Sequence, residues 1–440
     1  MGISLDGLAS GLDTTALISS IMQSEALPQT LLKNKSYDVQ SMVTALQGLN
    51  SKVAALATQA TAAAKPGALD LYTATTSSDK VVATTTASAK AGSIDFQVNK
   101  LAQTQVTVTD KVVGWPYTTM TINSGGQTYT ITPLTSSLDD VVNSVNAAGA
   151  GVTASKVSVG GGEFRLQFSA TKSGSAGAFT ISDAGTAFTD VKTAQDAEIA
   201  LWPGTTAAQT VKSSTNTFTD LLPGVSISAK EVTPAPVTLT VSRDDAGITK
   251  VASDLVDGVN GIFSLVASKS AVSTTTNTSG TTTSAGAFAG DSTVRSVNQS
   301  ILSAASLPVG TPPKSPSEIG ISITKTGTME FDGKKFAAAL AADPAGTAAK
   351  VQEIAGRIAT AATAASDKYT GTLTTTITGQ QSEVRDLADR ISDWDTRLAS
   401  RQATLKSTYS ALEVALSNMK AQQTWLSSQL AGLSTGSSSS

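Results

Sequence analysis

Cysteine and histidine are both absent from the 440 residues of this chain. Their absence excludes disulfides, thiolate nucleophiles, zinc sites built from the usual ligands and general catalysis by histidine. A chain without cysteine also suits an oxidising environment outside the cell, where a stray thiol would be oxidised. Most familiar kinds of enzyme active site are therefore unavailable to this protein.

Aromatic and charged residues are scarce, at 5% and 15% of the chain, while Ala, Ser, Thr and Gly dominate. Small and β-branched residues favour thin strands and close helix contacts over one large aromatic core. The net charge of -3 comes without a long basic run, so the footprint of a nucleic-acid-binding protein is missing. A hydrophobic content of 40% is enough to bury cores, and the length gives room for roughly two to four domains.

Long apolar runs are also lacking, and with none of about eighteen residues the sequence predicts no membrane-spanning segment. The N-terminus has no basic region followed by an apolar run, so we expect secretion without a cleavable signal peptide. A myristoylation motif is incomplete because Asp6 stands where Ser or Thr is required.

The strongest pattern present is a heptad repeat near the C-terminus, which we call the C-terminal seam. Its apolar positions recur every seven residues without an intervening proline: Val384, Ile391, Leu398, Leu405, Leu412, Met419, Leu426 and Leu433. The pattern predicts a coiled-coil helix roughly 75 Å long at 1.5 Å per residue. A companion apolar row moves from three to four residues after the seam, which favours a helix that meets more than one partner. A long surface helix packed on its own domain is the alternative.

A second seam, the N-terminal seam, advances in steps that are mostly three and four residues. It comprises Leu32, Val39, Met42, Leu46, Leu49, Val53, Leu56, Ala60 and Ala63. Only Lys35 interrupts it, and Lys65-Pro66-Gly67 ends it. A narrow apolar stripe has to be buried against another helix, so we expect the two seams to pair. A third coiled-coil helix is predicted between Ile248 and Val266, after the capping pair Asp244-Asp245.

We predict that the seams supply the contacts with partner chains and with other copies of the protein. The residues are Leu32, Val39, Met42, Leu46, Leu49, Val53, Leu56, Ile391, Trp394, Leu398, Leu405, Leu412, Met419, Trp425 and Leu426. For Trp394 a place in the chain's own core is the open alternative. Trp425, near the chain end, is the stronger candidate for a contact between chains.

Between Leu69 and Val241 the periodicity changes to alternation, which indicates half-buried β-strands. The alternating groups are Phe96/Val98, Val106/Val108, Phe164/Leu166/Phe168, Val225/Ile227 and Val237/Leu239/Val241. One short helix at residues 138–145 interrupts them, with Ser136 as its expected cap. Trp115-Pro116 and Trp202-Pro203-Gly204 mark the expected limits of one β domain inserted in another.

The remaining segments are expected to form shorter elements. Residues 270–284, almost wholly Ser, Thr, Gly and Asn, indicate a flexible linker or loop. Helices at residues 293–302 and 335–340 flank a hairpin that turns at Lys325-Thr326-Gly327. The glycine-spaced start of the chain and its serine tail are expected to lack stable structure.

The carboxylate pairs Asp139-Asp140 and Asp244-Asp245 are the only places where a glycosidase-like site could begin. Both stand where helix N-termini are predicted, and carboxylates there offset the helix dipole, so capping is the favoured role. Neither a Gly-x-x-x-x-Gly-Lys-Ser/Thr phosphate loop nor a Gly-x-Gly-x-x-Gly helix start after a buried strand is present. We predict no catalytic residue, no cofactor and no metal site, and therefore not an enzyme.

These elements predict an α+β multidomain fold, in which long terminal coiled-coil helices form a leg and one or two β-rich head domains are inserted between them. The expected ranges are 32–66 and 246–408 for the leg, 67–114 and 190–245 for a β-rich head domain, and 115–189 for a second β-rich domain inserted in the first. Residues 1–31 and 409–440 are expected to be mobile, the latter as a coil with a Ser-rich tail.

Motifs spread over nearly the whole chain occur together in the order typical of one family. They are Gly7-Leu8-Ala9-Ser10-Gly11-Leu12-Asp13-Thr14, Glu25, Pro28, residues 138–159, Phe164-Arg165-Leu166, Val241-Ser242-Arg243-Asp244, Ala289-Gly290-Asp291-Ser292-Thr293-Val294-Arg295, Gly320-Ile321, Gly327-Thr328, Phe331-Asp332, Trp394, Arg397-Leu398, Tyr409, Leu412, Met419 and Trp425-Leu426. In this order they resemble the bacterial flagellar filament cap family, flagellar hook-associated protein 2. Two positions depart from it: Gly258-Val259-Asn260 lacks the aromatic residue that commonly precedes the Asn, and Pro203-Gly204 replaces an Asp-Gly turn.

The resemblance implies a homo-oligomeric cap at the distal tip of the flagellum, outside the cell, which promotes the folding and insertion of flagellin and prevents its loss. It implies as partners other copies of the chain, flagellin, hook-filament junction proteins, an export chaperone and host surface ligands, but neither nucleic acid nor membrane. The alternative is a flagellar surface adhesin or a hook-filament junction protein with the same coils. A hydrolase carried on a stalk would need Asp139 or Asp244 for activity, and we expect none.

Overall fold

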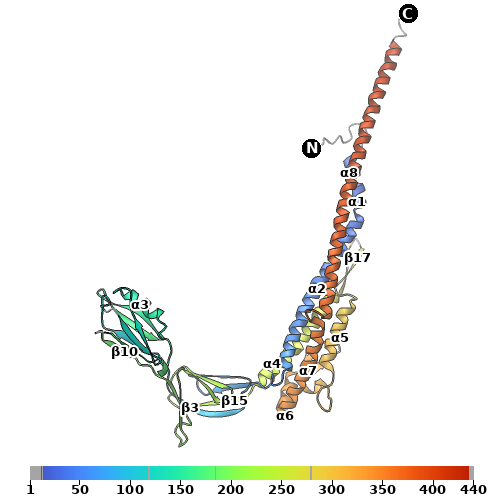
Figure 1. The fold of residues 1–440 in the computed structure, drawn as a ribbon. Helices are drawn as coiled ribbons and strands as arrows, with labels where there is room; N and C mark the ends of the chain where they lie inside the picture. The colour runs from blue at the N-terminus through green and yellow to red at the C-terminus, as the bar shows by residue number, and fades with distance from the viewer. Residues whose placement is uncertain (1–10, 12, 117–118, 184, 278–279, 436–440) are drawn as a thin grey trace. The chain divides into compact units, whose positions relative to one another are not determined.

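The structure, a computed structural model, describes residues 11, 13–116, 119–183, 185–277 and 280–435. The chain divides into two compact units, which we call the helical unit, residues 1–65 and 251–440, and the β unit, residues 66–250. Figure 1 shows helices from both ends of the chain in the first unit and sheets in the second. The predicted α+β fold, with terminal helices around a β-rich middle, is confirmed.

The helical unit is built from long helices that bury apolar stripes against one another. They are α1 (Thr14–Glu25), α2 (Leu27–Ala64), α4 (Asp245–Ser270), α5 (Ser292–Ser306), α6 (Gly333–Ala342), α7 (Pro344–Ser366) and α8 (Thr372–Thr435), with the short turn η2 (Pro316–Ile319). Asp13 caps α1 by accepting a hydrogen bond from the Ala16 amide at 2.7 Å. Pro28 stands in the first turn of α2, where its missing N–H costs nothing.

Helix α2 follows the predicted N-terminal seam. Its buried apolar residues are Val39, Val43, Ala45, Leu46, Leu49, Val53, Leu56, Ala57, Ala60 and Ala63. The helix ends at the predicted place, with Lys65 as the C-terminal cap. The seam therefore forms part of a core, and its partners decide which surfaces remain for other chains.

Helices α8 and α7 both pack along α2, and of these two only α8 was predicted as its partner. The second is α7, which was not predicted. Asp343 caps it by accepting a hydrogen bond from the Gly346 amide at 2.9 Å, and Pro344 occupies its first position. Its buried residues recur at helical spacing: Val351, Ile354, Ala355, Ile358, Ala362 and Ala365.

Helix α8 begins at Thr372, earlier than the predicted seam, and its 64 residues span roughly 96 Å at 1.5 Å per residue. Three polar contacts show that it runs antiparallel to α1 and α2. Lys35 pairs with Glu383 at 2.8 Å, Gln29 donates to Asp395 at 2.5 Å, and Glu25 accepts from Arg401 at 3.0 Å. The expected pairing of the two terminal helices is confirmed, but the C-terminal seam lies beside α1 and the start of α2 and not beside most of the N-terminal seam.

Helix α4 approaches α2 closely because Gly258 has no side chain. A Cβ at Gly258 would lie 3.0 Å from the Leu56 Cδ1 atom. Asn260, two residues later, donates to the Met329 carbonyl and accepts from the Met329 amide, both at 2.8 Å. The Gly258-Val259-Asn260 sequence, which departs from the family pattern, thus joins α4 to α2 on one side and to a hairpin on the other.

By length and composition, α4 could cross a membrane, and it is the one helix of the described part of the chain that meets this test. The prediction that no segment spans a membrane stays a prediction, because this helix is apolar on average without an uninterrupted apolar run. Ala252, Val259 and Ile262 on this helix are buried within the protein. Core helices of soluble proteins share this composition, so the burial of these residues accounts for it.

Two hairpins lie between the helices of this unit. The predicted one is present as β18 (Ile321–Ile323) and β19 (Met329–Phe331). The other, β16 (Val272–Asn277) paired with β17 (Gly280–Ala285), occupies the segment that we predicted to be a flexible linker. The prediction was wrong because it rested on Ser and Thr content, whereas Thr is β-branched and favours strands.

The β unit contains antiparallel sheets around two separate cores. The first core lies between a five-stranded sheet, in the order β1-β15-β3-β11-β12, and a three-stranded sheet, β13-β14-β2. The strands are β1 (Tyr72–Thr76), β2 (Val81–Thr85), β3 (Gly92–Lys100), β11 (Ala197–Leu201), β12 (Gln209–Ser213), β13 (Thr217–Leu222), β14 (Val225–Ala229) and β15 (Val237–Arg243). Phe96 and Val98 alternate with more exposed residues on β3, as predicted.

The second core lies between a four-stranded sheet, β10-β4-β8-β7, a three-stranded sheet, β6-β5-β9, and helix α3 (Leu138–Ala147). The strands are β4 (Val106–Thr109), β5 (Met120–Ser124), β6 (Gln127–Ile131), β7 (Val152–Gly160), β8 (Glu163–Ala170), β9 (Phe179–Ser182) and β10 (Phe188–Lys192), and the turn η1 (Ser175–Gly177) precedes β9. Ser137, and not the predicted Ser136, caps α3 by accepting a hydrogen bond from the Asp139 amide.

Strand β4 buries the opposite face from the one that its alternation suggested. Thr107 and Thr109 are buried, whereas Val106 and Val108 are half-buried. The buried hydroxyls are satisfied, since Thr107 donates to Asp190 at 2.6 Å and Thr109 donates to the Asp110 carbonyl at 2.7 Å. A polar network thus offsets the cost of burying this face.

The predicted division of the β unit into two domains stays a prediction, and sheet membership suggests one adjustment. Strands β4 and β10 belong to the sheet of the second core, although β4 lies outside the predicted range 115–189 and β10 extends beyond its end. The chain passes between the cores at Gln103 and Gln195, which form an isolated antiparallel bridge. Beside it, Gly174 adopts a φ of 80° and lies so close to Ser214 that a Cβ would approach the Ser214 Cα to 2.5 Å.

Asp196 forms hydrogen bonds at this crossing between the two cores. Its charge makes the stability of the β unit depend on pH. Its carboxylate accepts the Ser175 amide at 2.6 Å and the Ser175 hydroxyl at 2.8 Å, and the first of these bonds lowers the pKa of Asp196 most. A carboxyl whose pKa is lower in the folded state contributes stability above its unfolded pKa of about 3.9. That contribution is lost as the pH falls through the folded value.

We therefore expect Asp196→Asn to lower the urea midpoint of the β unit at neutral pH, with the difference shrinking as the pH falls through the lowered pKa of Asp196 and its carboxylate becomes protonated. Urea titrations of both proteins across this range check the prediction. A difference that stays constant with pH would show that the carboxylate charge does not contribute.

Candidate assembly surfaces

The paired carboxylates serve local structure in the described part of the chain. Asp244 accepts a hydrogen bond from the Gly247 amide at 2.8 Å, as a helix cap does. Asp245 is paired with the Arg243 guanidinium, and this hydrogen-bonded contact lowers the pKa of Asp245. Asp139 forms an ion pair with Lys156 at 2.5 Å. Across the described residues, no group of three or more Asp or Glu side chains is arranged to hold a metal ion.

The predicted contact residues of α2 lie mostly inside the helical unit. Leu46, Leu49 and Val53 have 0% of their surface exposed, and Val39 and Leu56 are also buried. They have no surface left for a second chain, so this corrects their assignment from partner contacts to the chain's own core. Leu32 and Met42 are half-buried and keep part of their surface.

The predicted residues of α8 become more exposed toward the C-terminus. Near the start of the helix Leu373 and Leu387 are buried. Ile391, Trp394, Leu398 and Leu405 are half-buried where α8 passes α1 and the start of α2. The Arg397 guanidinium lies 4.8 Å from the centre of the Trp394 ring and covers one face of that ring.

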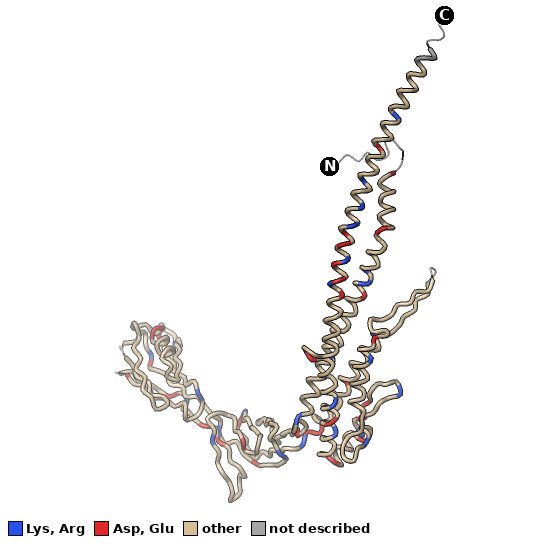
Figure 2. The backbone as a smooth tube through the Cα atoms, turned by 45° about the vertical axis from the view of Figure 1, so that its right-hand side comes forward, with Lys and Arg blue, Asp and Glu red and all other residues tan. Residues whose placement is uncertain are grey.

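Beyond this zone α8 carries a row of large apolar side chains in water, which we call the exposed stretch. The exposed fractions are 45% for Leu412, 59% for Met419, 63% for Trp425, 56% for Leu426 and 61% for Leu430. Figure 2 shows charges of both signs along the paired part of α8 and few in this stretch. Such a patch on a helix marks a surface that another protein covers. The assignment of these residues to partner contacts stays a prediction.

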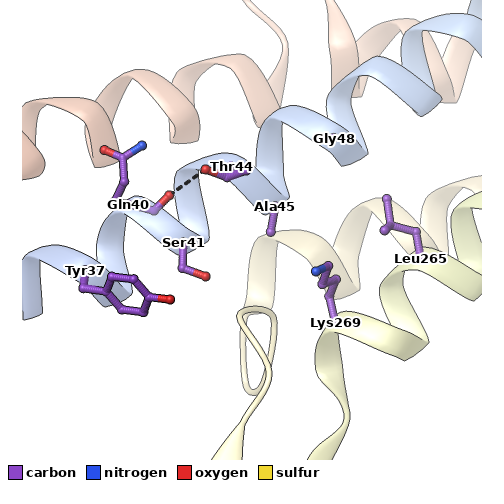
Figure 3. A pocket seen from close by; sticks show the side chains of 8 residues that line it. All are labelled: Tyr37, Gln40, Ser41, Thr44, Ala45, Gly48, Leu265 and Lys269. Atoms are coloured by element: carbon purple, nitrogen blue, oxygen red, sulfur yellow. Dashed lines mark hydrogen bonds between the residues drawn. The ribbon is translucent and has the colours of Figure 1, made fainter. Parts of the chain in front are cut away.

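Sequence reasoning missed a second surface, which we call the leg groove, between α2 and α4. This groove encloses ≈ 380 Å³. Its lining residues are Tyr37, Gln40, Ser41, Thr44, Ala45 and Gly48 of α2, with Leu265 and Lys269 of α4. Figure 3 shows the two helices facing each other across it. Small residues on the side of α2 away from its seam were the available signal, but a search for large apolar residues passes over them.

Models of one protein family match this chain over most of its length. The Flagellar hook-associated protein 2 C-terminus model matches residues 194–421, and the Flagellar hook-associated protein 2 N-terminus model matches residues 10–105. The chain belongs to the flagellar hook-associated protein 2 family. The Flagellin hook IN motif matches residues 119–172, which include α3, β7 and β8 of the second core.

Two relatives with this family name match almost the entire chain. A flagellar hook-associated protein 2 of Escherichia coli O157:H7 is 26% identical over 97% of this chain and 98% of its own length. A B-type flagellar hook-associated protein 2 of Pseudomonas aeruginosa is 29% identical over 97% of both. The crystal structure of the flagellar cap protein FliD from Escherichia coli, with domains D1-D2-D3, aligns with a TM-score of 0.61 at 25% identity, covering 76% of this chain and 99% of that one.

Membership of this family confirms the assignment to the flagellar cap proteins that the sequence motifs suggested. A flagellar hook-associated protein 2 is a structural component of the flagellum. The alternative assignments, a surface adhesin or a hook-filament junction protein, are not favoured by these similarities.

Proposed function

We propose that the chain is one subunit of a homo-oligomeric cap at the distal end of the filament, outside the cell, where it promotes insertion of flagellin and prevents its loss. The exposed stretch of α8 is the surface that neighbouring subunits or filament subunits cover. A solved structure that is 25% identical and covers 76% of this chain is named flagellar cap protein FliD, which supports this role.

The observation that carries the proposal is the exposure of the five named apolar side chains, and of Val414 beside them, on one continuous helix. Fully burying a side chain of this size stabilises a complex by about 1.5–3 kcal/mol. Part of that free energy offsets the entropy lost when the helix is held in place. A row of five can therefore support specific docking of the helix, whereas in water it only raises the risk of aggregation.

Because these apolar side chains are exposed, they need to be covered before the chain reaches the filament tip. Helical ends that lack a partner order themselves by burying their stripes against subunits already in place, so the entropy of ordering is offset on arrival. Before that, an export chaperone would cover the same apolar side chains. Residues 1–10, which belong to the predicted mobile segment, lie outside the described residues.

A strain that lacks its own cap protein tests the proposal. Expression of this chain there is expected to restore full-length filaments and to stop the leakage of flagellin into the medium. Immunoblots of culture supernatants and electron microscopy of the filaments measure both effects. A cap-deletion strain that already builds full-length filaments and leaks no flagellin would contradict the role, and would favour an adhesin or a junction protein.

A further inference from the structure

The β16–β17 hairpin has no support from the rest of the helical unit along its length. Every residue of β17 is exposed, and so are residues 272–276 of β16. The cross-strand side-chain hydrogen bonds that it makes stay inside it, between Thr276 and Thr281 at 3.2 Å and from Ser273 to the Ser284 carbonyl at 3.5 Å. Figure 2 shows the hairpin standing off the neighbouring helices. An isolated two-stranded hairpin is marginally stable in water, so a partner surface is needed to hold it.

Both edges of this hairpin are open to another chain. Its register runs without a shift from the Val272–Ala285 pair to the Asn277–Gly280 pair. Residues 272–285 include no charged residue and no proline. Edge strands of soluble proteins are usually protected by charges, prolines or bulges, because an unprotected edge pairs with other backbones. The missing protection indicates an edge that is covered when the protein is assembled.

The root of the hairpin is built to hold it in a fixed direction. The Gly286 amide donates to the Ala271 carbonyl and the Phe288 amide donates to the Lys269 carbonyl, both at 2.9 Å. Phe288 is buried, and a Cβ at Gly286 would lie 2.1 Å from the Lys269 carbonyl oxygen. A flexible linker would need none of these contacts. The hairpin is therefore an arm with a rigid base.

Whereas the arm protrudes, the leg groove is a hollow. Side chains normally fill the space between two packed helices, but here the space is open. A Cβ placed at Gly48 of α2 or at Gly261 of α4 would meet no atom of the described chain within 4 Å. Glycine inside a helix costs about 1 kcal/mol relative to alanine, and no neighbour in the described residues accounts for either one. Gly261 lies one turn before Leu265, so it shares the face of α4 that lines the groove. Both glycines leave room for a backbone that approaches closely.

We propose that the β16–β17 arm of one subunit lies in the leg groove of the next copy of this chain. The proposal rests on the homo-oligomeric cap proposed above. The exposed arm of the same chain does not fill the groove. An arm and a groove on one subunit form a head-to-tail interface, which closes into a ring when it is repeated around an axis.

The chemistry of the two surfaces agrees with this pairing. The arm is uncharged and offers hydroxyls and unpaired backbone carbonyls. The groove offers donors from the Lys269 ammonium, the Gln40 amide and the Tyr37 hydroxyl. Tyr37 is 76% exposed and would be covered by an occupant. Hydrogen bonds from these side-chain donors to the open carbonyls of the arm supply affinity, and the small groove residues select an occupant with small side chains.

Because the chain contains no cysteine, introduced thiols report on the contact without interference. The test pair is Thr275→Cys on the arm with Ser41→Cys in the groove, both exposed positions. The matched control pair replaces Ser41→Cys by Ser300→Cys, an exposed serine on α5. Each variant is expressed in a cap-deletion strain, and sheared flagella are treated with a short bis-maleimide before denaturing electrophoresis. We expect a ladder of cross-linked multimers from the test pair and monomer from the control pair.

Two results would overturn the proposal: capped filaments in which the test pair stays monomeric, or dimers from Thr275→Cys alone, which would show that arms pair with each other. If the unaltered chain fails to restore filaments, the proposed cap function is contradicted separately. The purified test-pair variant is then cross-linked in solution, where a monomeric product again overturns the arm-in-groove contact.

Discussion

Replacing Trp425 and Leu426 together by serine is expected to abolish capping while leaving the fold intact. Both side chains are more than half exposed, so their loss removes little from the chain's own core. If they are central contacts of the assembly, their truncation costs about 2–4 kcal/mol of binding, which weakens the contact on the order of 30-fold or more. Flagellin in the culture supernatant should rise to the level of a cap-deletion strain, with loss of swimming in soft agar.

The matched control is Gln422→Ser with Gln423→Ser, two exposed polar positions just before this pair on α8. It makes the same number of changes in the same segment and should keep near-normal swimming. Circular dichroism of both proteins checks that α8 is retained. Normal capping by the Trp425 and Leu426 variant would remove the exposed stretch from the assembly surface.

Leu49→Ala is expected to destabilise the helical unit by about 2–5 kcal/mol. Leu49 is 0% exposed on α2, the helix that packs along both α7 and α8, so the substitution leaves a cavity in the core. Urea unfolding followed by helical circular dichroism measures the loss. Because the β unit has its own cores, a separate β-unit transition should not move.

Leu31→Ala provides the control for the same change on the same helix. Leu31 is 69% exposed, so its truncation should alter the unfolding free energy by no more than about 0.5 kcal/mol. Equal effects of the two substitutions would mean that the N-terminal seam is not the core of the helical unit.

Sequence periodicity was sufficient to predict the terminal helices and that they pair, because a narrow apolar stripe requires a partner helix, but it did not give their antiparallel direction. It could not tell which seam residues face the chain's own helices and which face another chain. Leu49 and Leu426 look alike in a heptad, yet one is fully buried and the other is 56% exposed. The difference depends on α7, whose Ala-rich sequence has few large apolar residues and gave too weak a stripe to be recognised.

The two assembly surfaces differ in how visible they are in the sequence. The exposed stretch of α8 was anticipated because its residues are large and regularly spaced. The arm and the leg groove were not anticipated, because small residues form both of them. The threonines of the arm were interpreted as a linker, and Gly48 of the groove lies in the middle of a helix. A small residue can either destabilise its own helix or strand or leave room for a partner. The space around the residue decides between the two, and only the structure shows that space.

The antiparallel pairing of α2 with α8 also sets the order in which the chain can fold. Gln29 and Asp395, which form one of its contacts, are 366 positions apart, whereas the β unit is a contiguous segment of the chain. Contacts between distant residues form slowly, since the loop between them must close first. In a chain that emerges N-terminus first, the β unit can fold while the apolar stripe of α2 still lacks α8. Leu46 and Leu49 then remain open to aggregation until α7 and the start of α8 emerge, so segments late in the chain determine when its first long helix is protected.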